Sequence, residues 1–80
     1  MSTVKILFFG ATAEIAGERQ IEIPISNDLR AGAVLADIRK KFGGLASHKL
    51  HISVNQEYAT GEEILNDGDE LAIFSAVSGG

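Results

Sequence analysis

The most restrictive feature of the sequence is a regular alternation of isoleucines in its first third. Ile21, Ile23 and Ile25 are separated by single polar or cyclic residues, and a period of two places their side chains on one face of a β-strand. Pro24 cannot donate a hydrogen bond to a neighbouring strand, so we expect this strand at a sheet edge or ending there. A strand with one apolar face needs a second layer to cover it.

An earlier segment supplies the first partner for this strand. Residues 4–9 have strand composition, and Val4, Ile6 and Phe8 fall on one face. The small residues 11–16 can form one short helical turn before Gly17. This connection is too short for a full crossover helix, so the two strands are predicted to pair antiparallel.

One amphipathic helix is predicted after the second strand. Residues 26–28 are all good N-cap types, and apolar side chains recur at helical spacing over residues 34–42. Gly43 and Gly44 are expected to stop the helix, because left-handed backbone costs glycine little.

The remaining chain predicts strands and a turn. Residues 50–54 alternate in polarity, residues 57–60 can form a short strand, residues 66–69 are a turn, and residues 70–74 form the last strand. The order is strand, strand, helix, strand, short strand, strand, which indicates a two-layer α+β fold. With a right-handed crossover through the helix, the third strand lies parallel to the second or first.

Size and charge narrow the classes of function. Eighty residues make one small domain, whose core is too small to accommodate a deep active site without a large loss of stability. A carrier, an adaptor or a subunit is therefore favoured over an independent enzyme. The net charge of −4 argues against nucleic-acid binding and favours steering toward a basic protein. The chain has no cysteine, which excludes disulfides and thiol chemistry.

The sequence contains no clear targeting segment and no clear metal-binding motif. The apolar segment near the N-terminus is too short for a signal peptide or a membrane span, so we expect a soluble cytoplasmic protein. Neither His48 nor His51 has a carboxylate or a thiol close to it in the sequence. A strand over these residues would place their two side chains on opposite faces. We therefore expect no metal site.

The C-terminal residues have a distinctive chemical potential. Six residues follow the last predicted strand and can extend roughly 20 Å, so we divide the chain into a domain over 1–74 and an extended tail over 75–80. Glycines can enter a narrow partner channel. Adenylation would activate the terminal carboxylate toward sulfur, giving a thiocarboxylate without any side chain of this protein. A frayed chain end is the ordinary alternative.

Four segments of the sequence carry a resemblance to a known family: Ile6-Leu7-Phe8-Phe9, Val54-Asn55-Gln56, Leu65-Asn66-Asp67-Gly68-Asp69-Glu70 and Val77-Ser78-Gly79-Gly80. They resemble, in the same order and over nearly the whole chain, the small sulfur-carrier subunit of molybdopterin synthase. The resemblance implies a ubiquitin-like β-grasp fold, with a mixed sheet of four to five strands packed against one main helix.

The resemblance also implies a function and partners. An adenylyltransferase of the ubiquitin-activating type would use ATP to activate Gly80, which then becomes a thiocarboxylate. The large synthase subunit, in a two-plus-two heterotetramer, would use two such carriers to convert cyclic pyranopterin monophosphate into the dithiolene of molybdopterin. The chain itself would bind no cofactor and have no activity alone.

The resemblance further implies which residues meet the partners. Val77, Ser78 and Gly79 would enter the partner with Gly80, and Phe9, Tyr58 and Phe74 would contact it from the sheet; packing in the core is the alternative for these aromatics. The family often has Pro-Pro where this chain has Ser75-Ala76, and a basic residue where it has Ala13. These departures affect tail stiffness and one partner salt bridge.

Three other functions remain open. A thiamine-pathway sulfur carrier would share the fold and the Gly-Gly ending. A ubiquitin-like modifier would use the same adenylation to form isopeptide bonds with lysines. A plain interaction domain would leave the tail without a chemical role.

Overall fold

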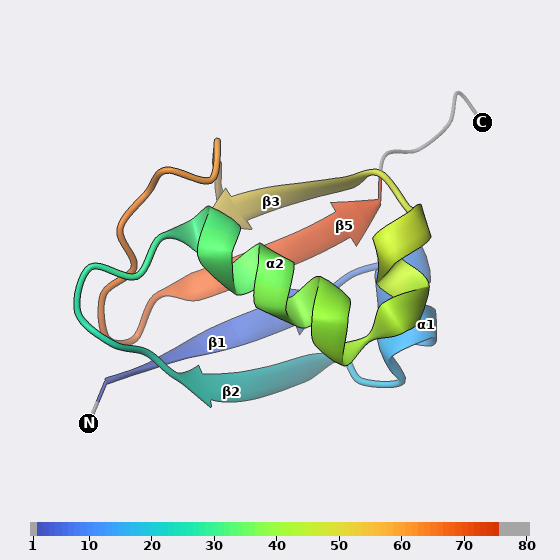
Figure 1. Cartoon of the computed structure of the whole chain (residues 1–80), viewed down its shortest axis with the longest axis horizontal. Helices are drawn as coiled ribbons and strands as arrows, with labels where there is room; N and C mark the ends of the chain where they lie inside the picture. Colours follow the sequence, from blue (N-terminus) through green and yellow to red (C-terminus); the bar gives the residue numbers. More distant parts are fainter. Residues whose placement is uncertain (1, 76–80) are drawn as a thin grey trace.

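The structure is a computed structural model that describes residues 2–75. In this part of the chain a five-stranded sheet, two α-helices and one 3₁₀-helix follow one another (Figure 1). The elements are β1 (Thr3–Phe8), α1 (Ala11–Ala16), β2 (Gln20–Pro24), α2 (Ala31–Lys41), η1 (Gly43–Ser47), β3 (Leu50–Val54), β4 (Glu57–Tyr58) and β5 (Glu70–Ser75).

The sheet is mixed, and its strand order is β2-β1-β5-β3-β4. β1 pairs antiparallel with β2, as predicted, and parallel with β5, which in turn pairs antiparallel with β3. β3 therefore runs in the same direction as β2 without being its neighbour. β2 is an edge strand, which agrees with the position expected for Pro24. The predicted α+β class is confirmed.

α2 lies across one face of the sheet (Figure 1) and closes the hydrophobic core against it. The alternating strand residues predicted for β1 point into this core, where Phe8 meets Phe42 edge-on at 5.6 Å between ring centroids. The isoleucines of the β2 segment are partly buried and pack around the core. The buried apolar side chains of the core are those of Val4, Ile6, Phe8, Ala31, Val34, Ile38, Leu45, Ile52, Leu65, Leu71 and Ile73.

The start of α2 differs from the prediction. Its N-cap is Arg30, and no side chain caps it, so assigning the cap to residues 26–28 was wrong. Backbone carbonyls of the loop before β5 replace the cap: the N–H of Ala31 donates to Glu63 O and that of Gly32 to Gly61 O, both at 2.8 Å. A Cβ on Gly32 would lie 3.0 Å from Gly61 O, so glycine allows this close approach.

The end of α2 also differs. Phe42 is the C-cap, with its N–H bonded to Ile38 O at 2.9 Å, and Gly43 and Gly44 begin η1 instead of adopting left-handed backbone. The expected glycine stop was therefore wrong in its geometry. A Cβ on Gly44 would lie 2.7 Å from Ile15 Cγ2. The missing side chain lets η1 pack against α1, and this packing decides the local conformation.

Candidate functional site

The end of β5 is the structural base of the predicted tail. β5 is held between β1 and β3, and its last residue, Ser75, pairs with Leu50. β5 thus extends one residue beyond the strand predicted over residues 70–74. The predicted tail residues Val77, Ser78, Gly79 and Gly80 lie outside the described residues.

A buried threonine fastens this end of β5. The Thr12 side chain is fully enclosed, and Oγ1 lies 2.7 Å from Phe9 O and 3.0 Å from Ile73 O, the two acceptors available to its single proton. The same oxygen accepts the N–H of Phe9 at 3.0 Å. Thr12 therefore joins α1, the end of β1 and the end of β5. The sequence analysis missed this residue, because a lone threonine in a small-residue segment carries no signal of long-range bonding.

The three aromatics predicted at the interface lie differently in the structure. Tyr58 is 84% exposed, Phe9 is 51% exposed and Phe74 is half-buried. The rings of Tyr58 and Phe74 meet edge-on with centroids 6.0 Å apart. Phe9 belongs to the neighbouring strand connection, since the preceding Phe8 pairs with Ile73. The structure thus joins two of the three aromatics in one cluster, with the third beside the same end of β5.

His51 completes this cluster, although the sequence analysis had considered it only as a metal ligand. It lies directly opposite Phe74 in the β3–β5 pairing, and the two rings stack with centroids 5.9 Å apart and planes 29° apart. We call His51, Tyr58 and Phe74 the outer-face cluster, because they lie on the sheet face away from α2. Strand register was the missing information, since it alone shows that residues 51 and 74 are neighbours.

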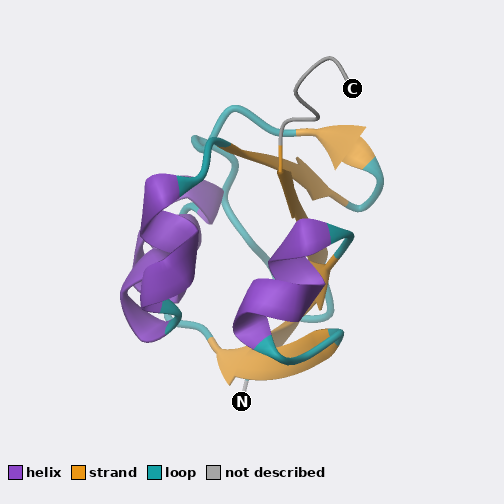
Figure 2. Cartoon of the chain, turned by 90° about the vertical axis from the view of Figure 1, so that its right-hand side faces the viewer, coloured by secondary structure: helices purple, strands orange, loops and turns teal. Residues whose placement is uncertain are grey.

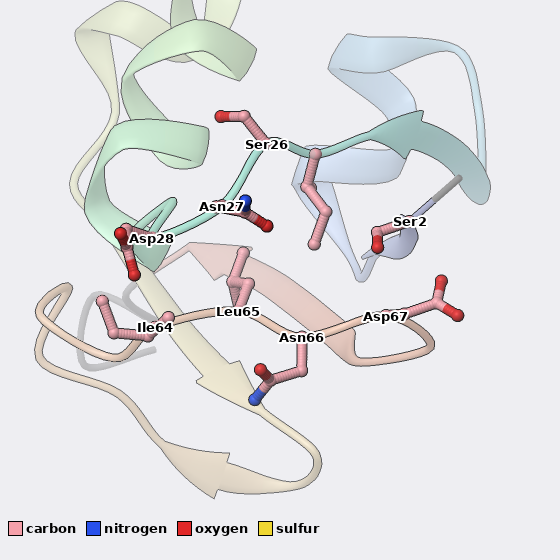
Figure 3. Close-up of a pocket in the computed structure, with 9 residues that line it drawn as sticks. Ser2, Ser26, Asn27, Asp28, Ile64, Leu65, Asn66 and Asp67 are labelled. Atoms are coloured by element: carbon pink, nitrogen blue, oxygen red, sulfur yellow. The ribbon is translucent and has the colours of Figure 1, made fainter.

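A recess of about 360 Å³ lies at the other end of the sheet, between the segment after β2 and the segment before β5. Figure 3 shows Asp28 and Asp67 on opposite sides of this recess, with Leu65 and Asn66 between them. Asp67 is already used by the fold, because its Oδ1 accepts the N–H of Thr3 at 2.9 Å. Across residues 2–75 no group of three His, Cys, Asp or Glu side chains is placed to hold a metal ion.

Glu63 supports the loop that caps α2. Its carboxylate accepts the backbone N–H of Thr60 at 2.8 Å and that of Gly61 at 2.9 Å. These bonds, with the Thr60 contact the strongest, lower the pKa of Glu63 from its ordinary value. Because Glu63 O and Gly61 O bond the start of α2, this carboxylate holds a structural loop and does not belong to a reactive site.

No helix within residues 2–75 is long and apolar enough to cross a membrane.

A mixed sheet whose outer strands flank a parallel central pair, with one main helix across a single face, defines the ubiquitin-like β-grasp class. Within that class the chain belongs to the ThiS family, whose model matches residues 6–80. The fold and the family resemblance predicted from the sequence are both confirmed.

Relatives and solved structures are consistent with this assignment. The chain is 32% identical to the molybdopterin synthase sulfur carrier subunit of Mycobacterium tuberculosis, with all of both chains covered. It superposes on small archaeal modifier protein 1 of Haloferax volcanii with a TM-score of 0.85 and 28% identity, covering 99% and 100% of the two chains. It also superposes on a chain from the complex of subunits 1 and 2 of the Helicobacter pylori molybdopterin-converting factor, with a TM-score of 0.67 and 27% identity, covering 98% and 99%.

Proposed function

We propose that this chain is the sulfur-carrier subunit of molybdopterin synthase. The observation that carries the proposal is the position of the outer-face cluster. Its half-buried member Phe74 lies on the final strand, near the end where that strand leads into the Gly-Gly sequence, and contacts the exposed rings of His51 and Tyr58. Aromatic side chains of this kind are the usual anchors of protein interfaces. A partner docked on the cluster would therefore lie close to the base of the tail.

The proposed chemistry takes place at Gly80 and is carried out by other proteins. An adenylyltransferase of the ubiquitin-activating type joins the Gly80 carboxylate to AMP, releasing pyrophosphate from ATP. A donor of sulfide-level sulfur then attacks the acyl carbon, the bond to AMP breaks, and Gly80 ends in a thiocarboxylate. The large synthase subunit, in a two-plus-two heterotetramer, receives this sulfur and transfers it to cyclic pyranopterin monophosphate. This chain contributes a rigid body that presents one reactive group.

The described residues can hold the end of β5, from which the predicted tail starts, in a fixed position. β5 is paired on both sides, and Thr12 bonds to the carbonyl of Ile73 two residues before the strand ends. A tail that starts from a fixed point loses less freedom on docking than one that starts from a mobile loop. Thr12 thus acts as a positioning residue in the proposed transfer.

Intact-mass measurement of protein isolated from cells tests the proposal. We expect a species heavier by the difference between one sulfur and one oxygen atom. This species should be absent after deletion of Gly80, and absent from cells lacking the adenylyltransferase. Wild-type protein carrying the thiocarboxylate should support dithiolene formation with the large subunit. If it carries sulfur but fails in that reaction, the molybdopterin assignment is wrong and the thiamine-pathway carrier becomes the better assignment.

The likeness to small archaeal modifier protein 1 supports a second candidate function, attachment to lysines of other proteins. Adenylation of Gly80 is common to both functions, so the mass of the free protein does not separate them. Lysine-linked conjugates that disappear with deletion of Gly80 would support the modifier function.

A further inference from the structure

The turn that joins β3 to β4 has an unusual backbone. It consists of two residues, Asn55 and Gln56, because Val54 pairs with Glu57 across it. Both turn residues have positive φ angles, 50° for Asn55 and 72° for Gln56, as a type I′ hairpin turn requires. Asparagine tolerates this left-handed backbone, but the second position favours glycine, and a residue with a Cβ is strained there. The turn therefore needs other contacts to hold its shape.

Asn55 supplies these contacts. Its Oδ1 accepts the N–H of Glu70 at 3.0 Å, and its Nδ2 donates to Asp69 Oδ1 at 3.0 Å. Its backbone N–H also donates to Glu70 O at 2.8 Å. The other carboxylate oxygen of Asp69 accepts the N–H of Asn66 at 2.8 Å, so the hairpin is joined to the loop that leads into β5. The three bonds of Asn55, which we call the Asn55 clamp, fix the turn to the start of β5.

The position of Tyr58 depends on this turn. Tyr58 belongs to β4, the outermost strand of the sheet, which consists of Glu57 and Tyr58 and pairs with β3. A strand this short has little stability of its own, so the turn sets the direction in which it leaves β3. This direction brings the ring of Tyr58 to Phe74, with 6.0 Å between the ring centroids. The exposed ring of the outer-face cluster is thus presented by the hairpin.

Asn55 lies at the opposite end of β5 from the predicted tail. In Figure 1, β3 ends at the left, where the turn follows it, and β5 ends at the right. Figure 2 views the molecule from this right-hand end. Glu70, to which Asn55 bonds, precedes Phe74 by four residues, or about 13 Å along a strand. A partner docked around Phe74 would meet the ring of Tyr58 beside it, and we expect Asn55 to act through that ring.

We propose that Asn55 is a positioning residue for docking, whose clamp holds the strained turn so that Tyr58 stands beside Phe74 before the large synthase subunit binds. The identity of that partner rests on the proposed function. A ring that is already in place loses little freedom on binding, whereas a loose hairpin would first have to be ordered. The clamp also accounts for the presence of Gln56 where the turn favours glycine.

A double-mutant cycle, measured as affinity for the large subunit, tests this role. Tyr58→Ala should weaken binding by about tenfold, as expected of an exposed aromatic anchor, and Asn55→Ala by about fivefold. In protein that already carries Tyr58→Ala, adding Asn55→Ala should change the affinity by less than about twofold, because the clamp then has no ring to position. Asn66→Ala is the matched control. It removes the same kind of side chain from a residue that bonds Asp69 through its backbone N–H, and should change the affinity by less than about twofold.

The position of the ring can also be measured without the partner. In solution NMR, nuclear Overhauser contacts between the rings of Tyr58 and Phe74 should be present in wild-type protein and in Asn66→Ala, and weaker in Asn55→Ala. If Asn55→Ala does not fold, Asn55→Gly replaces it, because glycine adopts left-handed backbone at low cost and lacks the side-chain amide. Both measurements are made well below the unfolding midpoint of each variant, so that a general loss of stability does not lower the affinity.

The outcomes separate the positioning role from the proposed function. Additive losses in Asn55→Ala and Tyr58→Ala would overturn the role, because Asn55 would then affect binding independently of the ring. Wild-type affinity in either single variant, unchanged ring contacts in the Asn55 variant, or an equal loss in Asn66→Ala would also overturn it. If wild-type protein does not bind the large subunit at all, the proposed function itself fails and the docking role fails with it.

Discussion

The two faces of the sheet have opposite characters, although they are made by neighbouring residues. On β5, Ile73 points into the core and is fully enclosed, while the next residue, Phe74, lies in the outer-face cluster and is half-buried. The inner face is apolar and covered by α2, and the outer face carries His51 and Tyr58 exposed to solvent. One strand thus serves stability on one face and recognition on the other, so substitutions at adjacent positions should have separable effects.

The largest effect is expected from Ile73→Ala on the inner face. Removing this fully enclosed side chain leaves a cavity and should lower the free energy of unfolding by about 3 kcal/mol, a large share of what a small domain has. Denaturant unfolding measures the loss. Ile73→Val is the control, with an expected loss of about 1 kcal/mol. An Ile73→Ala protein as stable as the wild type would contradict the assignment of this face to the core.

Phe74→Ala should change recognition and leave the fold largely intact. Loss of the central ring of the outer-face cluster should weaken binding to the large synthase subunit by about 2 kcal/mol, or roughly thirtyfold, because Phe74 joins His51 and Tyr58. Calorimetry and denaturant unfolding measure the two effects. Phe42→Ala is the matched control, since Phe42 packs on Phe8 and should affect stability alone. If Phe74→Ala instead mainly lowered the free energy of unfolding, Phe74 would belong to the core and the two faces would not differ in role.

Thr12→Val tests the connection that holds the end of β5. Valine keeps the shape but removes one bond from Ile73 O and one from the Phe9 N–H, which then keeps only its bond to Ile73 O at 3.1 Å. The free energy of unfolding should fall by about 1–2 kcal/mol. Hydrogen exchange at the Phe9 amide should also become faster. Thr12→Ser retains the hydroxyl and should recover most of this protection; equal exchange rates in both variants would mean that the hydroxyl does not hold this junction.

The smallest effect is expected from Glu63→Gln, remote from both faces. The folded-state pKa of Glu63 lies below its ordinary 4.5. Its ionised form therefore stabilises the fold fully above about that pH, and the stabilisation is lost as the pH falls through the lower folded value. Thermal unfolding should show wild-type protein slightly more stable than Glu63→Gln at neutral pH, with the difference vanishing in acid. Glu62→Gln serves as the control and should show no such convergence.

Much of the fold was predictable because local pattern and burial agree. Alternation identified β1, β2, β3 and β5, and helical spacing identified α2. The ends of α2 were not predictable, because neither depends on its own flanking sequence. Carbonyls from Gly61 and Glu63 complete its start, and packing of η1 against Ile15 shapes the region after its end. Both contacts join segments that are distant along the chain.

The features of the candidate site also divide into those that the sequence predicts and those that only the tertiary structure reveals. The sequence by itself determined the terminal Gly-Gly, the absence of cysteine, the uneven distribution of charge and the period-two strands, since these follow from residue type and order. Only the tertiary structure decided that His51 stacks on Phe74 and that Thr12 bonds to Ile73. Strand register and helix packing produce these neighbours, and neither is encoded by local periodicity.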